Sequence, residues 1–194
     1  TTVPTITSFT STTADGSYKS AGTVNITATA SEAVVATNTI TATLDTSDNV
    51  TLTAADNGTT LVGTYTVSAG DNSTDLTVSS FSIGTVTDIA GNVMASTAVP
   101  DTNIASGSAI VIDTTAPTIT SFTSTTSNGS YKSAGEVNIT ATASEAVVAT
   151  NTITATLDTG RAVTLTAADN GTTLVGTYTV SASENSNDLT VSSF

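Results

Sequence analysis

The feature that most constrains this chain is a tandem duplication. Residues 114–194 repeat residues 1–81 at a constant offset of 113 positions, and all but 10 of the 81 aligned positions are identical. The segments PTITSFTSTT, GSYKSAG and ITATASEAVVATNTITATLDT occur in both copies. This match is closer than packing requires, because cores tolerate extensive apolar exchange. Arrays of near-identical repeats act through length, spacing and surface rather than through one active site.

The repeat length predicts two domains. A period of 113 residues is a usual size for a domain, so we expect one domain over residues 1–113 and another over residues 114–194. The second copy lacks the counterpart of Ser82–Asp113, which a packed domain would need to close its sheet. Either the chain continues beyond Phe194 or another copy supplies the missing strands, and the sequence leaves both possibilities open.

Composition and periodicity predict an all-β fold. Thr accounts for 48 of the 194 residues, and its β-branched side chain favours strands. Apolar and polar residues alternate, as half-buried strands do. The expected strands of the first copy are Thr5–Ser11, Val24–Ala30, Thr39–Leu44, Val50–Ala54, Leu61–Val67, Leu76–Ile83 and Ala105–Ile112. About seven strands per repeat are typical of an immunoglobulin-like β-sandwich, so we predict two in tandem, the second one truncated in this chain.

The order of these strands predicts which loops share an end of each sandwich. We expect Ser31–Ala36, Ala55–Thr60 and Asp88–Asn92 at one pole and Ala14–Ala21, Asp45–Asn49 and Ala69–Asp75 at the other. The Asn57-Gly58 pair predicts a hairpin turn. Most acidic residues therefore gather at the two poles, which is where consecutive domains meet.

Charge and residue types exclude several classes of function. With 16 Asp and Glu against 3 Lys and Arg, the net charge is −13, which opposes binding to nucleic acid and to anionic membrane surfaces. No apolar run is long enough to cross a bilayer. Without His or Cys the chain has no Ser-His-Asp triad, no thiol nucleophile and none of the usual zinc ligands. We therefore expect no enzyme.

The motifs GSYKSAG, VNITATASEAV, TLDT, LVGTYTVSAGDNSTDL, VTDIAGN and IDTTAPT occur in this order in the first copy. Together they resemble the bacterial immunoglobulin-like repeats, of the cadherin-like or Big type, of giant extracellular adhesins. The resemblance spans nearly all of the first repeat and all of the truncated second one. It implies a bacterial cell-surface location, neighbouring repeats of the same chain as partners, and calcium as the cofactor at domain junctions.

Carried over by position, the resemblance implies seven metal ligands. They are Asp113 in the linker, Glu32 and Glu145 after a Ser, Asp71 and Asp75 in the acidic turn, and Asp88 and Asn92 in the Asp-x-x-Gly-Asn loop. The one complete junction would combine Asp113, Glu145 and either Asp71 or Asp75. Glu32, Asp88 and Asn92 would form a weaker site at the first pole.

The sequence also departs from the pattern of these adhesin repeats. The usual aromatic residue before Ser-Glu is Ala30 and Ala143 here, and Asp71 is replaced by Glu184 in the second copy. No contiguous calcium loop of the D-x-D-x-D-G kind is present. The same acidic residues therefore also suit solvated turns, because Asp and Asn favour turns by bonding their own backbone.

The expected function is a structural spacer or stalk repeat of a long bacterial surface adhesin, rigidified by calcium at the interdomain junction. One alternative is a self-assembling extracellular filament or surface-layer subunit, in which copies exchange strands. A second alternative is a carbohydrate- or ice-binding module built on outward threonine rows such as those at 27–29 and 39–41. We expect no nucleic-acid partner and no direct insertion into a membrane.

Overall fold

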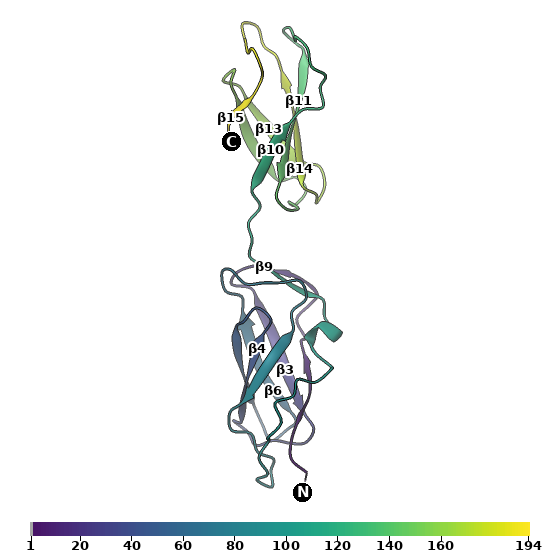
Figure 1. Ribbon diagram of the computed structural model, residues 1–194, viewed down its shortest axis with the longest axis vertical. Helices are drawn as coiled ribbons and strands as arrows, with labels where there is room; N and C mark the ends of the chain where they lie inside the picture. Colours follow the sequence, from purple (N-terminus) through teal and green to yellow (C-terminus); the bar gives the residue numbers. More distant parts are fainter. Residues whose placement is uncertain (1) are drawn as a thin grey trace. The chain divides into compact units, whose positions relative to one another are not determined.

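The computed structural model describes residues 2–194, which divide into two compact units (Figure 1). Unit 1 ends at Thr115, and unit 2 spans Ala116–Phe194. Both are all-β, as predicted: over the described residues the single helical element is the 3-10 turn η1 (Ile104–Ser106). No helix in this part of the chain is long and apolar enough to cross a membrane.

Unit 1 contains two sheets. The larger has six strands in the order β1-β3-β6-β5-β4-β8, and the smaller has three in the order β2-β9-β7. The strands are β1 (Ile6–Thr10), β2 (Gly16–Tyr18), β3 (Thr23–Ala30), β4 (Thr39–Leu44), β5 (Asn49–Ala54), β6 (Thr60–Thr66), β7 (Asn72–Ser73), β8 (Val78–Ile83) and β9 (Ile110–Asp113). In the smaller sheet β9 runs parallel to β2 and antiparallel to β7.

The core of unit 1 follows from the alternation of its strands. In β3 and β4 every second residue is buried, with Ile26 and Ile40 fully buried and the threonines between them partly exposed. The two edge strands of the large sheet also meet, because the rings of Phe9 on β1 and Phe81 on β8 lie 5.5 Å apart in an edge-to-face contact. The sheet therefore curls over its own apolar face into a sandwich-like arrangement.

Strand β9 closes this arrangement. Ile110 and Ile112 of β9 are fully buried, and the backbone of the strand is bonded on both sides. Gly16 N donates to Ala109 O at 3.0 Å, and Leu76 N donates to Ile110 O at 2.8 Å. Because β2 pairs only with β9 and β7 pairs only with β9, both short strands depend on it.

The structure corrects three details of the predicted strands. Unit 1 has nine strands rather than about seven, since β2 and β7 are too short to show alternation. The predicted strand Ala105–Ile112 begins instead with η1, because the Asn103 side chain caps that turn by accepting from Ile104 N. The predicted β5–β6 hairpin is confirmed, but five residues connect its strands and Gly58 does not adopt a positive φ.

Unit 2 reproduces the large sheet alone. Its strands β10 (Ile119–Thr123), β11 (Glu136–Ala143), β12 (Thr152–Leu157), β13 (Ala162–Ala167), β14 (Thr173–Thr179) and β15 (Val191–Ser193) follow the order β10-β11-β14-β13-β12-β15. Residues 129–131 and 185–186, the counterparts of β2 and β7, form no strand. The core is correspondingly more open: Phe122 and Leu189 are partly exposed, whereas their counterparts in unit 1 are fully buried.

Candidate functional site

Two acidic loops meet at the far pole of unit 1, as the strand order predicts. Asp45, in the turn after β4, accepts the Ser73 hydroxyl at Oδ2 (2.6 Å) and Thr77 N at Oδ1 (3.2 Å). One carboxylate thus ties the β4–β5 turn to the loop around β7. In unit 2 Asp158 does the same with the Ser186 hydroxyl at 2.6 Å, and these hydrogen bonds lower the pKa of Asp158. Sequence reasoning missed this aspartate, although it lies in the TLDT motif.

Asp71 forms the centre of the same loop. Its Oδ2 accepts the Tyr65 hydroxyl at 2.6 Å and Ser68 N at 2.7 Å. Partial burial alone would raise the pKa of Asp71, but the hydrogen bonds from Tyr65 and Ser68 outweigh it and the pKa is lowered. Asp48 lies beside this carboxylate, and its own pKa is raised by a shared hydrogen bond with Asp71, by burial and by charge repulsion.

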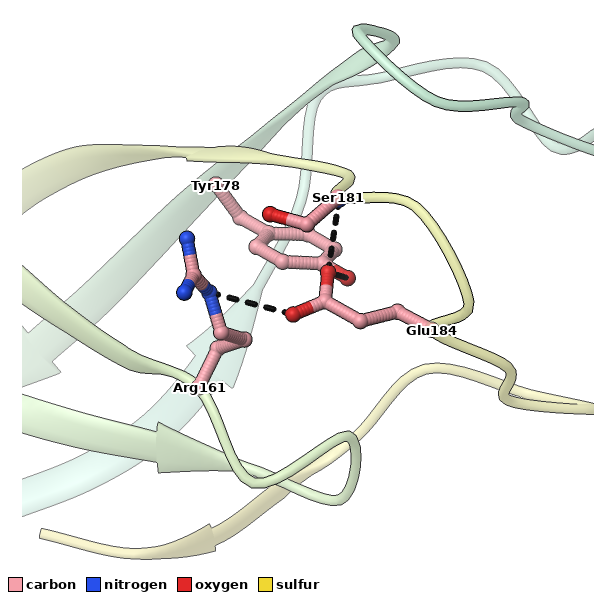
Figure 2. A network of polar contacts seen from close by, with 4 residues as sticks. All are labelled: Arg161, Tyr178, Ser181 and Glu184. Atoms are coloured by element: carbon pink, nitrogen blue, oxygen red, sulfur yellow. Dashed lines mark hydrogen bonds and ion pairs between the residues drawn. The ribbon is translucent and has the colours of Figure 1, made fainter.

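The second copy builds this loop with a different charge pattern, shown in Figure 2. Glu184, the counterpart of Asp71, accepts the Tyr178 hydroxyl at 2.8 Å and Ser181 N at 2.7 Å through Oε2. Its Oε1 lies 3.1 Å from Nε of Arg161, which stands where the first copy has Asp48. The hydrogen bond from Ser181 N, the Tyr178 hydroxyl and the Arg161 charge hold the pKa of Glu184 below its usual range, against some burial.

These two positions therefore differ together between the copies. Unit 1 places two carboxylates side by side, and unit 2 replaces the pair with an ion pair, the single one among residues 2–194. In both units the residue at the position of Asp71 anchors the loop by the same two hydrogen bonds. Both copies thus share the same loop anchor, and unit 2 adds a positively charged side chain, Arg161, beside it.

Asp113 and Asp75 also lie at this pole of unit 1. Asp113 ends β9 with an exposed side chain whose Oδ1 accepts Thr115 N at 3.0 Å. Its neighbour Thr114 donates its hydroxyl to Asp71 O at 3.0 Å, so the linker is attached to the Asp71 loop. Asp75 is exposed, and its backbone amide donates to the Ser73 hydroxyl at 3.3 Å.

Two of the three predicted ligands at the first pole of unit 1, Asp88 and Asn92, are hydrogen-bonded to each other. Asp88 is buried, and its two carboxylate oxygens accept Asn92 N at 2.7 Å and Asn92 Nδ2 at 2.6 Å. The Asn92 side chain is the main cause of a lowered pKa for Asp88. Glu32 accepts the Thr2 hydroxyl at 3.3 Å. The hydrogen bonds between Asp88 and Asn92 stabilise their loop.

Glu145, in unit 2, has an unsatisfied carboxylate oxygen. Its Oε1 is shielded from solvent and has no hydrogen-bond partner within residues 2–194. A shielded carboxylate oxygen without a donor suits a cation, and calcium prefers such oxygen ligands. Across the described residues, no three acidic side chains lie close enough to form a metal-binding group by themselves.

Unit 2 contains two cavities. The first, of about 700 Å³, is lined by residues 126–131 and 184–191 together with apolar side chains of the sheet. Its walls are the counterparts of β2 and β7, so it lies where β9 lies in unit 1. The second, of about 830 Å³, is lined by residues including Val147, Ile153 and Phe194. In unit 1 the segment containing the buried Val86 and Met94 covers that region.

Comparison of the chain with protein-family models found no match. Comparison with curated proteins found none either. The function is therefore inferred from the repeat, the fold and the local chemistry alone.

Proposed function

We propose that this chain is a non-enzymatic structural spacer of a long bacterial surface protein, built from immunoglobulin-like repeats and located outside the cell. The observation that carries the proposal is the near-identity of two consecutive all-β units at a period of 113 residues. A chain selected for repeated length gains from copies that fold alike, whereas a catalytic chain needs one specialised site.

The use of the polar side chains supports a structural role. The carboxylates of Asp45, Asp71 and Asp88 accept hydrogen bonds from their own loops. Each therefore fixes a turn at a pole rather than presenting a reactive group in a cleft. Outward threonines such as Thr27 and Thr41 lie between buried residues of a strand, where a β-branched residue is expected for its strand propensity alone.

Calcium is the proposed cofactor, and its role would be to stiffen the connection between successive repeats. Asp113 ends the last strand of unit 1, and only one of its carboxylate oxygens accepts a hydrogen bond. Glu145 contributes the shielded oxygen described above. Calcium takes six to eight oxygen ligands, so backbone carbonyls and water would complete any such site.

The test is X-ray scattering and thermal melting of the whole chain, with calcium and after chelation. A ligand that binds only the folded state stabilises it by mass action, so chelation should lower the melting temperature and change the scattering profile. Asp113→Ala should remove most of this response. Asp101→Ala is the matched control, because it also removes one exposed aspartate. If the melting temperature and the scattering profile of the unmodified chain are the same with calcium and after chelation, calcium is excluded as a stiffening cofactor.

A second candidate is a self-assembling filament or surface-layer subunit. One observation favours it: unit 2 has an open groove at the place where unit 1 contains a strand. Size measurements on the purified chain distinguish this candidate from the spacer, since a filament subunit should polymerise as its concentration rises.

A further inference from the structure

Two short segments are strands in one copy and not in the other. Residues 129–131 have the sequence Gly-Ser-Tyr of β2, and residues 185–186 have the sequence Asn-Ser of β7. In unit 1 both segments pair with β9, and in unit 2 neither pairs with anything among residues 2–194. Identical sequence with different structure shows that the pairing partner, not local propensity, makes these strands.

Two backbone amides that are hydrogen-bonded in unit 1 lack a partner in unit 2. In unit 1 the amides of Gly16 and Leu76 donate to the backbone carbonyls of Ala109 and Ile110. Their counterparts, Gly129 N and Leu189 N, have no acceptor within the described part of the chain. Two residues that line the groove therefore have backbone amides without a partner, where unit 1 satisfies both equivalent amides with one strand.

The groove of unit 2 also exposes apolar surface. The floor of the 700 Å³ groove is formed by Phe122, Val137, Ile139, Leu157, Leu189 and Val191. Tyr131 at its rim is 41% exposed, whereas its counterpart Tyr18 is partly buried against the core of unit 1. In unit 1 the matching surface is covered by Ile110 and Ile112, which are both fully buried. The apolar floor of the groove therefore matches a strand that carries two apolar side chains two residues apart, as β9 does with Ile110 and Ile112.

From these observations we propose that the groove of unit 2 is a binding site for a strand of the β9 kind, supplied in addition to these 194 residues. Its occupant is an extended segment with the sequence pattern of Thr102–Thr115, lying parallel to residues 129–131 and antiparallel to residues 185–186. The two isoleucines fill the apolar positions, and backbone carbonyls of the bound strand accept hydrogen bonds from Gly129 N and Leu189 N. This proposal does not rest on calcium.

The register follows from unit 1, where Ser17 pairs with Val111 and Tyr18 pairs with Ile112. The bound strand should therefore place its Val111 position beside Ser130 and its Ile112 position beside Tyr131. In unit 1 Ser17 and Val111 are both at least partly exposed, while Ile112 points inward. Side chains of the first pair are thus accessible from solvent and lie on the same face.

A second copy of the chain is a poorer occupant. Its own β9 already lies between β2 and β7 of its own unit 1. Removing that strand to fill unit 2 of a neighbour would open one groove for each groove it closes. A separate strand closes the groove without this loss, and mass action then stabilises the closed unit 2.

The experiment uses the full 194-residue chain and a fluorescein-labelled peptide of residues 102–115. Anisotropy should report saturable binding at one peptide per chain, because the equivalent place in unit 1 is filled. A control peptide with Ile110→Asp and Ile112→Asp should bind at least tenfold more weakly, since it puts two charges into the apolar floor. Equal binding of the two peptides, or none by either, overturns the proposal.

Cysteine trapping tests the register, since the chain has no cysteine of its own. With an added thiol oxidant to accept the two electrons, Ser130→Cys in the chain should form a disulfide rapidly with a peptide carrying Val111→Cys. A peptide carrying Ile112→Cys should react at least tenfold more slowly, because that position faces inward. Equal trapping of both peptides contradicts the proposed register. A chain dimer that excess peptide does not dissociate would assign the groove to a second copy and overturn the proposal.

Discussion

At the scale of single residues, the two copies show that the fold sets turn conformation more strongly than the local residue does. Ser47 has φ of 75° where the second copy has Gly160 at 81°, and Gly70 has φ of 98° where the second copy has Ser183 at 69°. Each copy therefore places one serine in the left-handed region, which glycine adopts without steric cost. The surrounding strands hold the turn in either case.

This exchange gives a direct prediction. Ser47→Gly should stabilise unit 1 by about 1 kcal/mol, because it removes the steric cost of a left-handed non-glycine residue. The reverse change at the matched position, Gly160→Ser, should destabilise unit 2 by a similar amount. Urea denaturation followed by circular dichroism measures both free energies of unfolding. Two changes of the same sign would contradict the explanation.

The paired carboxylates of unit 1 give a second prediction. Asp48→Arg, which introduces the residue of the second copy, should stabilise unit 1 at pH 7 by about 0.2 to 1 kcal/mol, the range for exposed charge pairs. The reason is that the negative charge of Asp48 is disfavoured beside Asp71: a shared hydrogen bond with Asp71, burial and charge repulsion raise its pKa.

The pH dependence follows from the same shift. Because the pKa of Asp48 is raised in the folded state, its favourable contribution is present below its ordinary pKa of 3.8 and is lost as pH rises through the folded value. The advantage of Asp48→Arg should therefore shrink as pH falls below about 4. In unit 2, Arg161→Asp should be destabilising at pH 7. An advantage of Asp48→Arg that is the same at pH 3 and pH 7 would argue against charge repulsion as its cause.

At the scale of elements, alternation predicted the long strands well and the short ones not at all. The predicted strand Thr39–Leu44 coincides with β4, and the predicted strand Val50–Ala54 differs from β5 by one residue. These strands have one buried face, which imposes a period of two on the sequence. Strands β2 and β7 carry no such signal, because each exists only through its pairing with β9.

The candidate site shows the same division. Strand order alone indicated that acidic loops gather at the poles, and the hydrogen bond linking Asp45 to Ser73 agrees with this. Sequence reasoning could not show that Asp88 is satisfied by Asn92, because that depends on how the backbone turns between the two residues. It also missed the role of Arg161. The sequence does show that Asp48 becomes Arg161 in the same copy in which Asp71 becomes Glu184, and these two changes form the ion pair.

Asn103 is the residue on which the third prediction depends. Its side chain accepts from Val78 N at 3.0 Å and donates to Val78 O at 2.9 Å, which attaches the segment before η1 to the edge strand β8. Asn103→Ala leaves both partly buried backbone groups unpaired, so unit 1 should lose about 1 to 3 kcal/mol of stability. Denaturant unfolding measures the loss.

Asn49→Ala is the matched control for this substitution, because the second copy has Ala162 at that position. It removes an exposed hydrogen bond with the Thr43 hydroxyl of 2.7 Å, so the expected change is within about 0.5 kcal/mol. Equal losses from the two asparagine variants would show that Asn103 does not attach β8 in the way its geometry indicates.

At the scale of the whole molecule, the two units have separate apolar cores of unequal size. The core of unit 1 includes residues of both sheets and of η1, such as Phe9, Ile104 and Ile112. The core of unit 2 contains fewer than half as many buried residues, and it lacks the contribution of a β9 strand. Since buried apolar area is the main source of stability, unit 2 should be the less stable of the two.

This inequality leads to the last prediction, which uses one leucine that is fully buried in both copies. Leu52 in β5 and Leu165 in β13 occupy equivalent positions and are both 0% exposed. Truncating such a side chain to Ala costs about 2 to 5 kcal/mol. Calorimetry of the unmodified chain should show two transitions, with unit 2 unfolding first.

Leu165→Ala should therefore lower or abolish the first transition and leave the second unchanged, because its cavity lies in the smaller core. Leu52→Ala should lower the second transition and bring the two closer together. Strand binding adds a further distinction: saturating peptide of residues 102–115 should raise the first transition alone, since only unit 2 has the open groove. A single transition that both leucine variants shift equally would mean that the two cores unfold together. The prediction that unit 2 is less stable and unfolds first would then be wrong.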